Sequence, residues 1–277
     1  MKILGVDFTS APRKAKPIIA AWGHLAGDAL HLDTLQALPD WAKFEALLAT
    51  AGPWVGAFDL PFGLPREMVQ DLAWPTHWPD LVRHCEALGK AGFTTAIDHY
   101  RAGRAPGHKF AHRATDHPAG SSSPMKLINP PVGLMFLEGA PRLLAAGVHI
   151  PCLHPGDDNR IALEGYPGYI ARSLTRASYK SDTRQKQTPE RAQARHHILD
   201  ALTRGENSLG LTLRTSTELQ NALAQDPSGD CLDATLCALQ AAWSAQRQHQ
   251  GFGLPQPIDP IEGWIATVPQ PIGQGQR

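Results

Sequence analysis

Residues 3–10 read ILGVDFTS, an apolar run that ends abruptly on an acid. A run such as Ile3-Leu4-Gly5-Val6 is typical of a strand that is buried on both faces. Asp7 follows it directly, either as a solvated turn residue or as a ligand held at the edge of a sheet. These residues alone leave both alternatives open, so the decision depends on what the rest of the chain places beside them.

Residues 1–60 predict the element order β-β-β-α-β. The expected strands are residues 2–7, 17–23 and 29–35, followed by a helix that starts at Pro39-Asp40 and stops at Gly52-Pro53, and by a strand over residues 54–58. That last strand also ends on an acid, Asp59. A helical crossover makes it parallel to its neighbour in the sheet. Because ligands gather at the carboxyl ends of strands in such sheets, we expect Asp7 and Asp59 at one edge.

The remainder of the chain predicts a large insertion and then a return to the core. Residues 64–148 combine short helical stretches with long loops, which in a compact domain are usually functional or disordered. A short strand then ends on a third acid, Glu164, and the later expected elements are helices at residues 167–174, 189–202, 215–224 and 229–248 and an edge strand or cover at 263–268. We therefore expect an α/β fold, a mixed sheet flanked by helices, as a single domain over residues 1–268 with a flexible tail at 269–277.

Two further acids, Asp230 and Asp233, stand at the start of the last long helix. Acids in a first turn commonly cap the helix or complement its dipole, and for the pair taken alone this structural role is the more frequent one. Their i, i+3 spacing nevertheless puts both on one helix face, which can turn toward the sheet edge that carries the other acids. Converging carboxylates are what Mg²⁺ or Mn²⁺ require, and one or two such ions can activate water and neutralise the leaving oxygen of a phosphodiester.

The chain carries 26 basic and 26 acidic side chains, so its formal net charge is zero and a phosphate-bearing partner must be bound by local patches. Two basic stretches meet this need, residues 101–113 and 172–195. Lys180 and Lys126 are candidates to contact a scissile phosphate, although a solvated surface lysine is the commoner role for each. The side chains expected to contact nucleic acid are Arg101, Arg104, Lys109, Arg113, Lys126, Arg184 and Lys186.

Several classes of protein are disfavoured by what the sequence lacks. Neither a phosphate-binding P-loop nor a nucleophile elbow nor an HExxH motif occurs. The four cysteines form no CxxC pair, which argues against a sulfur-bound metal and fits a reducing compartment. There is also no basic leader with an apolar segment behind it, and no apolar run long enough to cross a bilayer. We therefore expect a soluble cytoplasmic protein, with no membrane partner and no obligate protein partner.

The acids lie within a set of distinctive segments, GVDFTSAP, GAFDLPFGLP, SSPMKLINPPVG, EGYPGYIARSL, SYKSD and GDCLDATLCALQAAW. Together these segments resemble the family called domain of unknown function 429, described as predicted nucleases of the ribonuclease H fold. The resemblance spans residue 3 to about residue 268. The acids on strands one and four, with a D-x-x-D pair on a late helix, also resemble the Holliday-junction-resolvase branch of the ribonuclease H-like superfamily.

The resemblance implies a ribonuclease H-like fold, nuclease activity and metal ligands at Asp7, Asp59, Asp230 and Asp233, with Glu164 as a further candidate. One position departs from the resolvase pattern, because the fourth strand there commonly ends on Glu. Asp59 is one methylene shorter, which bears on whether two metal ions can be held. The expected catalytic set is Asp7, Asp59, Glu164, Asp230, Asp233 and Lys180, with Mg²⁺ or Mn²⁺ as the cofactor.

The leading hypothesis is a metal-dependent phosphodiesterase, a nuclease that cleaves DNA or RNA through a metal-activated water. The first alternative is an actin-like ATPase or phosphotransferase, because that superfamily shares the core fold and places small hydroxyl residues after its first acid, as Thr9-Ser10 do here. Against it, the chain has no second Gly-rich phosphate hairpin. The second alternative is a nucleic-acid-binding adaptor that has lost turnover, with which the zero net charge is compatible.

Overall fold

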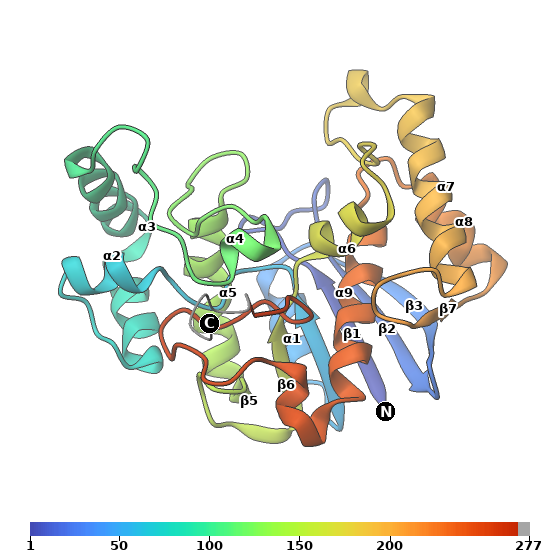
Figure 1. Ribbon diagram of the computed structural model, residues 1–277, viewed down its shortest axis with the longest axis horizontal. Helices are drawn as coiled ribbons and strands as arrows, with labels where there is room; N and C mark the ends of the chain where they lie inside the picture. The colour runs from blue at the N-terminus through green and yellow to red at the C-terminus, as the bar shows by residue number, and fades with distance from the viewer. Residues whose placement is uncertain (271–277) are drawn as a thin grey trace, which may run out of the picture.

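A computed structural model describes residues 1–270, and within them it contains one seven-stranded mixed sheet (Figure 1). The strand order across the sheet is β5-β6-β4-β1-β2-β3-β7. β1, β4 and β6 are parallel neighbours, whereas β2 is antiparallel to both β1 and β3. The strands are β1 (Lys2–Asp7), β2 (Ile18–Ala26), β3 (Ala29–Leu38), β4 (Trp54–Phe58), β5 (Val148–His149), β6 (Asp157–Glu164) and β7 (Thr212–Arg214).

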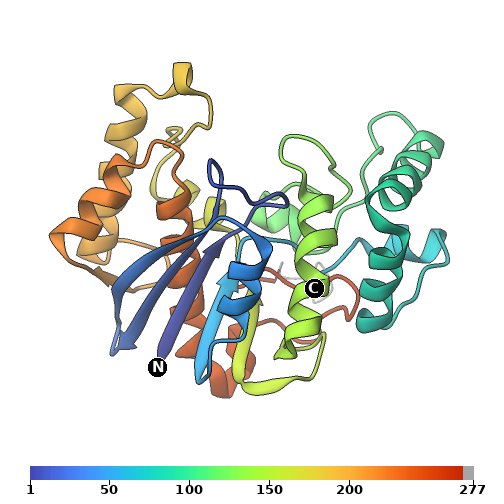
Figure 2. The ribbon, with the colours of Figure 1, turned by 180° about the vertical axis from the view of Figure 1, so that it is seen from behind.

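Helices cover both faces of the sheet. α9 lies across the face seen in Figure 1, with α6, α7 and α8 beside it, whereas α1 and α5 cover the face seen in Figure 2. Among residues 1–270 there is no helix with both the length and the apolar character needed to cross a membrane. The helices are α1 (Trp41–Leu48), α2 (Arg66–Asp71), α3 (Trp78–Gly103), α4 (Asp116–Ala119), α5 (Val132–Ala146), α6 (Pro167–Leu174), α7 (Pro189–Arg204), α8 (Thr217–Gln225) and α9 (Asp230–Ala245), with short 3₁₀ helices η1 (Arg184–Lys186) and η2 (Gln248–Gly253).

The mixed α/β fold and its order of elements agree with the sequence prediction, and the differences have local causes. β2 is longer than predicted by residues 24–26, which pair with residues 29–31 next to the turn, and β3 is longer by residues 36–38, which pair with residues 18–20 of β2. Within residues 64–148, where short helical stretches are expected, α3 is a long helix that runs on past a kink at Gly89, where φ is 61°. Residues 263–268 form a cover rather than an edge strand, with a single bridge from Ile265 to Glu164. Most of the predicted tail at 269–277 lies outside the described residues.

The predicted insertion at residues 64–148 builds one side of the core. Trp78 and Phe93 of α3 and Phe136 of α5 are fully buried, and they belong to one apolar cluster with Leu4 and Val6 of β1. The apolar positions of this region are spread across separate helices and loops, so no single sequence window displays their periodicity. The region therefore packs directly on the sheet instead of standing apart from it.

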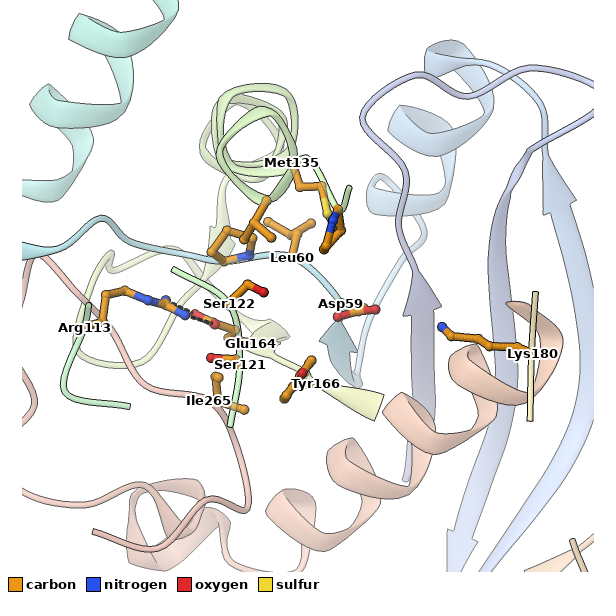
Figure 3. A pocket seen from close by; sticks show the side chains of 14 residues that line it. Asp59, Leu60, Arg113, Ser121, Ser122, Met135, Glu164, Tyr166, Lys180 and Ile265 are labelled. Atoms are coloured by element: carbon orange, nitrogen blue, oxygen red, sulfur yellow. Dashed lines mark hydrogen bonds and ion pairs between the residues drawn. The ribbon is translucent and has the colours of Figure 1, made fainter. Parts of the chain in front are cut away.

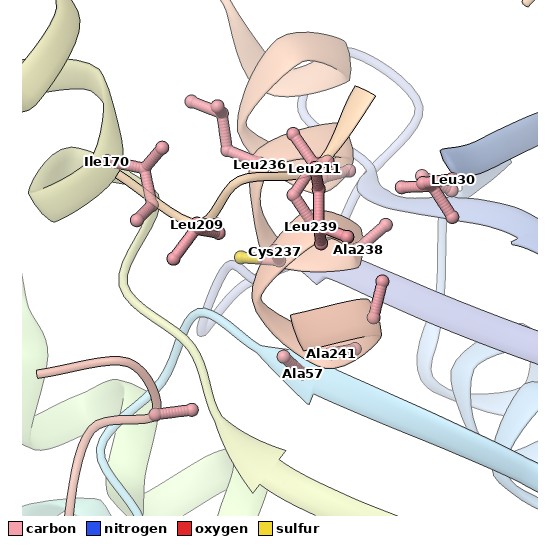
Figure 4. Close-up of a cluster of buried hydrophobic side chains, with 14 of the residues drawn as sticks. Leu30, Ala57, Ile170, Leu209, Leu211, Leu236, Cys237, Ala238, Leu239 and Ala241 are labelled. Atoms are coloured by element: carbon pink, nitrogen blue, oxygen red, sulfur yellow. The ribbon is translucent and has the colours of Figure 1, made fainter. Parts of the chain in front are cut away.

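The other face of the sheet is covered by α9, which lies unusually close to β1. A Cβ atom at Gly5 would stand 2.0 Å from the carbonyl oxygen of Ala234 and 2.2 Å from the amide nitrogen of Ala238. The helix therefore rests backbone against backbone on the strand, and small residues such as Ala238 and Ala241 line the contact in Figure 4. This contact brings the first turn of α9 to the carboxyl end of β1.

Gly5→Ala is expected to destabilise the protein by about 3 kcal/mol, because an added methyl group meets helix backbone that cannot move aside. Urea unfolding measures the change. Gly103→Ala is the control, since a Cβ atom there meets nothing within 4 Å. Equal stability of the two variants would contradict the close approach of α9 to β1.

Candidate functional site

Three strands end on acids at the same edge of the sheet. Asp7 ends β1, Glu164 ends β6, and Asp59 directly follows β4, which lies between them. The amide of Asp59 donates to the carbonyl oxygen of Val6 over 2.8 Å, so the backbone fixes the spacing of the first two acids. The pairing of β1 with β4 as parallel neighbours agrees with the expectation that Asp7 and Asp59 lie at one edge of the sheet, and the place of Glu164 beside them on β6 is a finding of the structure.

The first turn of α9 adds two more acids to this edge. Asp230 and Asp233 are both buried, and Asp233 is fully so. The helix begins after Gly229, whose φ of 77° favours glycine and whose Cα lies against the side chain of Lys180. A Cβ atom at Gly229 would stand 2.6 Å from the Cβ atom of Lys180. Glycine at this position thus allows Lys180 to reach the acids.

Lys180 is the cation at the centre of the group. Its ammonium donates to Asp233 Oδ2, while the hydroxyl of Tyr179 donates to Asp233 Oδ1. Burial alone would lower the pKa of Lys180, but the negative charges around it, Asp233 first and also Asp7, raise the pKa well above its usual value. Lys180 is therefore charged and acts as the counter-ion of the buried acids.

One cation does not neutralise the group. Burial and then the charges of Asp233 and Asp230 raise the pKa of Asp7 well above its usual value, with Lys180 opposing the shift. Burial is also the main cause that raises the pKa of Asp59 to about 7. The concentration of negative charge at this edge therefore disfavours the ionised forms of Asp7 and Asp59.

Asp230 has a cation of its own that sequence reasoning missed. Lys16, in the loop between β1 and β2, donates to both oxygens of Asp230 over 2.9 Å and to Asp182 over 2.6 Å. Tyr179 was also missed, although it stands in the SYKSD segment next to Lys180. Lys16 gives no comparable signal, because it reaches Asp230 only through the folding of β1 and β2 against α9.

Glu164 is held apart from the aspartates by Arg113. Its two oxygens each accept a hydrogen bond of 2.7 Å from the Arg113 guanidinium, which also binds Asp116 at 2.9 Å. Arg113 is only 2% exposed, so it differs from the surface cation that the sequence predicts for nucleic-acid contact. The physical reason is that two buried acids draw the guanidinium inward. Both oxygens of Glu164 therefore already have a cationic partner, although its charge still contributes to the raised pKa of Asp59.

The other predicted nucleic-acid contacts fall into two groups. Arg101 and Arg104 lie at the end of α3 and pair with Asp98 and Glu67, and Lys109 donates to backbone oxygens of the same region. Arg184 and Lys186 lie exposed on η1, at the opposite side of the sheet edge in Figure 1. Lys126 is half-buried in the loop before α5.

The aspartates offer the oxygen donors that a hard divalent cation prefers. Within residues 1–270, however, no three acid, histidine or cysteine side chains are grouped tightly enough to hold a metal ion as they stand. Lys180 supplies positive charge to Asp7, Asp59 and Asp233 instead. The aspartate oxygens are thus suitable donors for a divalent cation. The ammonium of Lys180 already forms an ion pair with one of these aspartates, Asp233.

A cavity of about 200 Å³ opens beside Asp59 and Lys180 (Figure 3). Its far end is the Arg113–Glu164 ion pair, and Tyr166 and the hydroxyls of Ser121 and Ser122 also line it. None of these cavity residues except the charged ones was singled out in the sequence. The acid group therefore lies next to a cavity that is large enough to admit a small chemical group.

The comparisons with known proteins point to one family. The sequence profile described as "Protein of unknown function (DUF429)" matches residues 5–260. No curated protein and no solved structure matches the chain.

Asp59→Asn is expected to stabilise the metal-free protein at about pH 8 and to have much less effect near pH 4. With the pKa of Asp59 raised from 3.8 to about 7, the folded state keeps a proton that the unfolded state has released. The contribution of this group to stability therefore falls as the pH rises from about 4 to about 7. The amide of asparagine cannot ionise, so the variant does not lose this stability as the pH rises. Its melting temperature at about pH 8 therefore rises by roughly 2–4 °C for each kcal/mol of unfolding free energy regained.

Melting temperatures in EDTA at the two pH values check this expectation. Asp200→Asn, at an exposed position of α7, is the control and changes little at either pH. An effect of Asp59→Asn that is the same at both pH values would contradict the assignment.

Proposed function

The chain belongs to the DUF429 family of proteins of unknown function, and we propose that it is a metal-dependent phosphodiesterase that cleaves nucleic acid. The observation that carries the proposal is the gathering of Asp7, Asp59, Asp230 and Asp233 at one sheet edge. We also propose that the sheet is ribonuclease H-like. Its order β3-β2-β1-β4-β6, with β2 antiparallel and β4 and β6 parallel to β1, supports this assignment.

The four aspartates are the proposed ligands of Mg²⁺ or Mn²⁺. Bound there, the ion would lower the pKa of a water molecule and neutralise charge on the leaving oxygen. The residues themselves concentrate negative charge and, through burial, limit the access of bulk water. We leave Glu164 out of the ligand set because Arg113 occupies both of its oxygens, and we assign it instead to fixing Arg113 at the end of the cavity.

Lys180 has two tasks in this proposal. It compensates the aspartates when no other cation is present, and its ammonium lines the cavity, where it can contact a phosphate oxygen. The exposed cations Arg184 and Lys186 on η1, with Lys126, are proposed to hold the nucleic-acid backbone. Arg101, Arg104 and Lys109 have protein partners and are secondary contacts.

We retain a cytoplasmic location with nucleic acid as the partner. The four free cysteines are consistent with a reducing compartment. ATP hydrolysis is a competing function that the assay below distinguishes. Nucleic-acid binding without turnover is the other, and binding in the absence of cleavage would identify it.

Asp7→Asn is expected to reduce metal-dependent cleavage by at least about 100-fold, because it removes a charged oxygen donor from the centre of the site. Purified protein is assayed with Mg²⁺ or Mn²⁺ on single-stranded, duplex, hybrid and branched nucleic acids and on ATP. Asp33→Asn, on an exposed position of β3, is the matched control. Equal cleavage by wild type and Asp7→Asn would refute the proposal, and phosphate release from ATP alone would favour the ATPase.

Lys180→Met is expected to lower the melting temperature of the metal-free protein at about pH 8, since the aspartates lose their counter-ion. Added Mn²⁺ then stabilises this variant more than the wild type, because the ion no longer competes with an ammonium. Thermal shift titrations measure both effects, with Lys186→Met on η1 as the control. An identical Mn²⁺ response in wild type and Lys180→Met would show that the lysine and the ion do not share a site.

A further inference from the structure

The cavity beside the acids has an apolar lining that the proposed cleavage reaction does not require. Asp59 and Lys180 stand at one end, and the remaining lining is mostly apolar. At about 200 Å³ the cavity is smaller than the roughly 300–1,000 Å³ typical of pockets that enclose a whole ligand. It therefore suits one part of a larger molecule whose charged part remains outside.

One wall of the cavity consists of Leu60 and Met135, in the upper part of Figure 3. Leu60 lies against α5 at Gly139, where a Cβ atom would stand 2.8 Å from a methyl carbon of Leu60. Met135 is one turn before Gly139 on the same helix face. Because Gly139 has no side chain, Leu60 packs directly against the backbone of α5, and the two residues Leu60 and Met135 form a continuous apolar surface.

The opposite wall consists of Tyr166 and Ile265. Tyr166 is fixed at both ends: its amide donates to Gln240 Oε1 over 2.8 Å, and its hydroxyl donates to the carbonyl oxygen of Gly120 over 3.3 Å. The guanidinium of Arg172 lies 5.1 Å from the ring centroid. An aromatic ring held in this way is already oriented before a ligand arrives.

The closed end of the cavity is a buried network of hydrogen bonds. Arg113 donates two hydrogen bonds of 2.7 Å to Glu164 and one of 2.9 Å to Asp116, so a single guanidinium is shared by two acids. We call the space between the walls of Leu60 and Met135 and of Tyr166 and Ile265 the apolar slot. Its two facing apolar walls and its charged mouth fit a flat, uncharged group that is joined to a phosphate.

We propose that the apolar slot binds one unpaired nucleobase of the substrate, stacked on Tyr166, with the adjoining phosphate at Asp59 and Lys180. This inference rests on the proposed function and specifies its substrate. A base in an intact duplex is stacked and paired, so it can enter a slot only after it has been extruded. The preferred substrate class is therefore single-stranded or end-unpaired nucleic acid, bound largely through stacking and backbone contacts.

The test is equilibrium binding in Mn²⁺, measured by fluorescence anisotropy with labelled oligonucleotides that carry a nuclease-resistant phosphorothioate backbone. The probes are a single strand, the same strand in a blunt duplex, and a single strand of abasic nucleotides. Tyr166→Ala is compared with the conservative variant Tyr166→Phe. The expected results are tighter binding of the single strand than of either other probe, about tenfold weaker single-strand binding by Tyr166→Ala, and recovery in Tyr166→Phe.

Wild-type binding of duplex or abasic strand as tight as that of the single strand would overturn the inference, as would full affinity in Tyr166→Ala. If circular dichroism shows that Tyr166→Ala does not fold, Met135→Ala and Met135→Leu make the same comparison from the opposite wall. Because the probes resist cleavage, ring-dependent binding without activity on natural substrates would uphold the slot and reject the phosphodiesterase. Cleavage of natural substrates together with binding that does not depend on the Tyr166 ring would uphold the phosphodiesterase and reject the slot.

Discussion

The backbone contact between α9 and β1 at Gly5 is the constraint on which the rest of the structure depends. A side chain at that position would separate the helix from the sheet by a full layer of atoms. With glycine there, the first turn of α9 comes level with Asp7, and Asp230 and Asp233 enter the same buried region. Packing of apolar surface on both sides of the sheet thus holds together carboxylates that would otherwise repel each other.

The electrostatic consequence is a site that favours cations. Four aspartates share the charges of Lys180 and Lys16, and the pKa of Asp7 is raised even though Lys180 opposes the shift. Natural sequences usually depart from favourable local rules at functional sites and compensate for the cost elsewhere. Here the compensation is the extensive core on the two faces of the sheet. The cost of gathering the acids is thus borne by the fold, and the proposed binding of a metal ion would be the benefit that offsets it.

The sequence predicts those parts of the site that follow from local pattern. Asp7 and Asp59 could be found because each ends an apolar strand, and the Asp230–Asp233 pair because its spacing defines a helix face. Arg113 was placed on the surface because its partner Glu164 is 51 residues away. Lys16 is 214 residues from Asp230, and only the assembled sheet brings the two together. Contacts of this kind carry no signature in a single sequence, which is why the cavity and its ion pair were missed.

The segment that carries Tyr179 and Lys180 is bound to α7 as well as to α9. Arg191 and Arg195, one turn apart on α7, donate to the backbone oxygens of Lys180 and Tyr179. The position of the ammonium above Asp233 is therefore set by a helix whose N-terminal end adjoins the exposed basic η1. Because η1 ends only a few residues before α7 begins, the two arginine hydrogen bonds connect the exposed basic rim to the backbone that carries the buried ammonium.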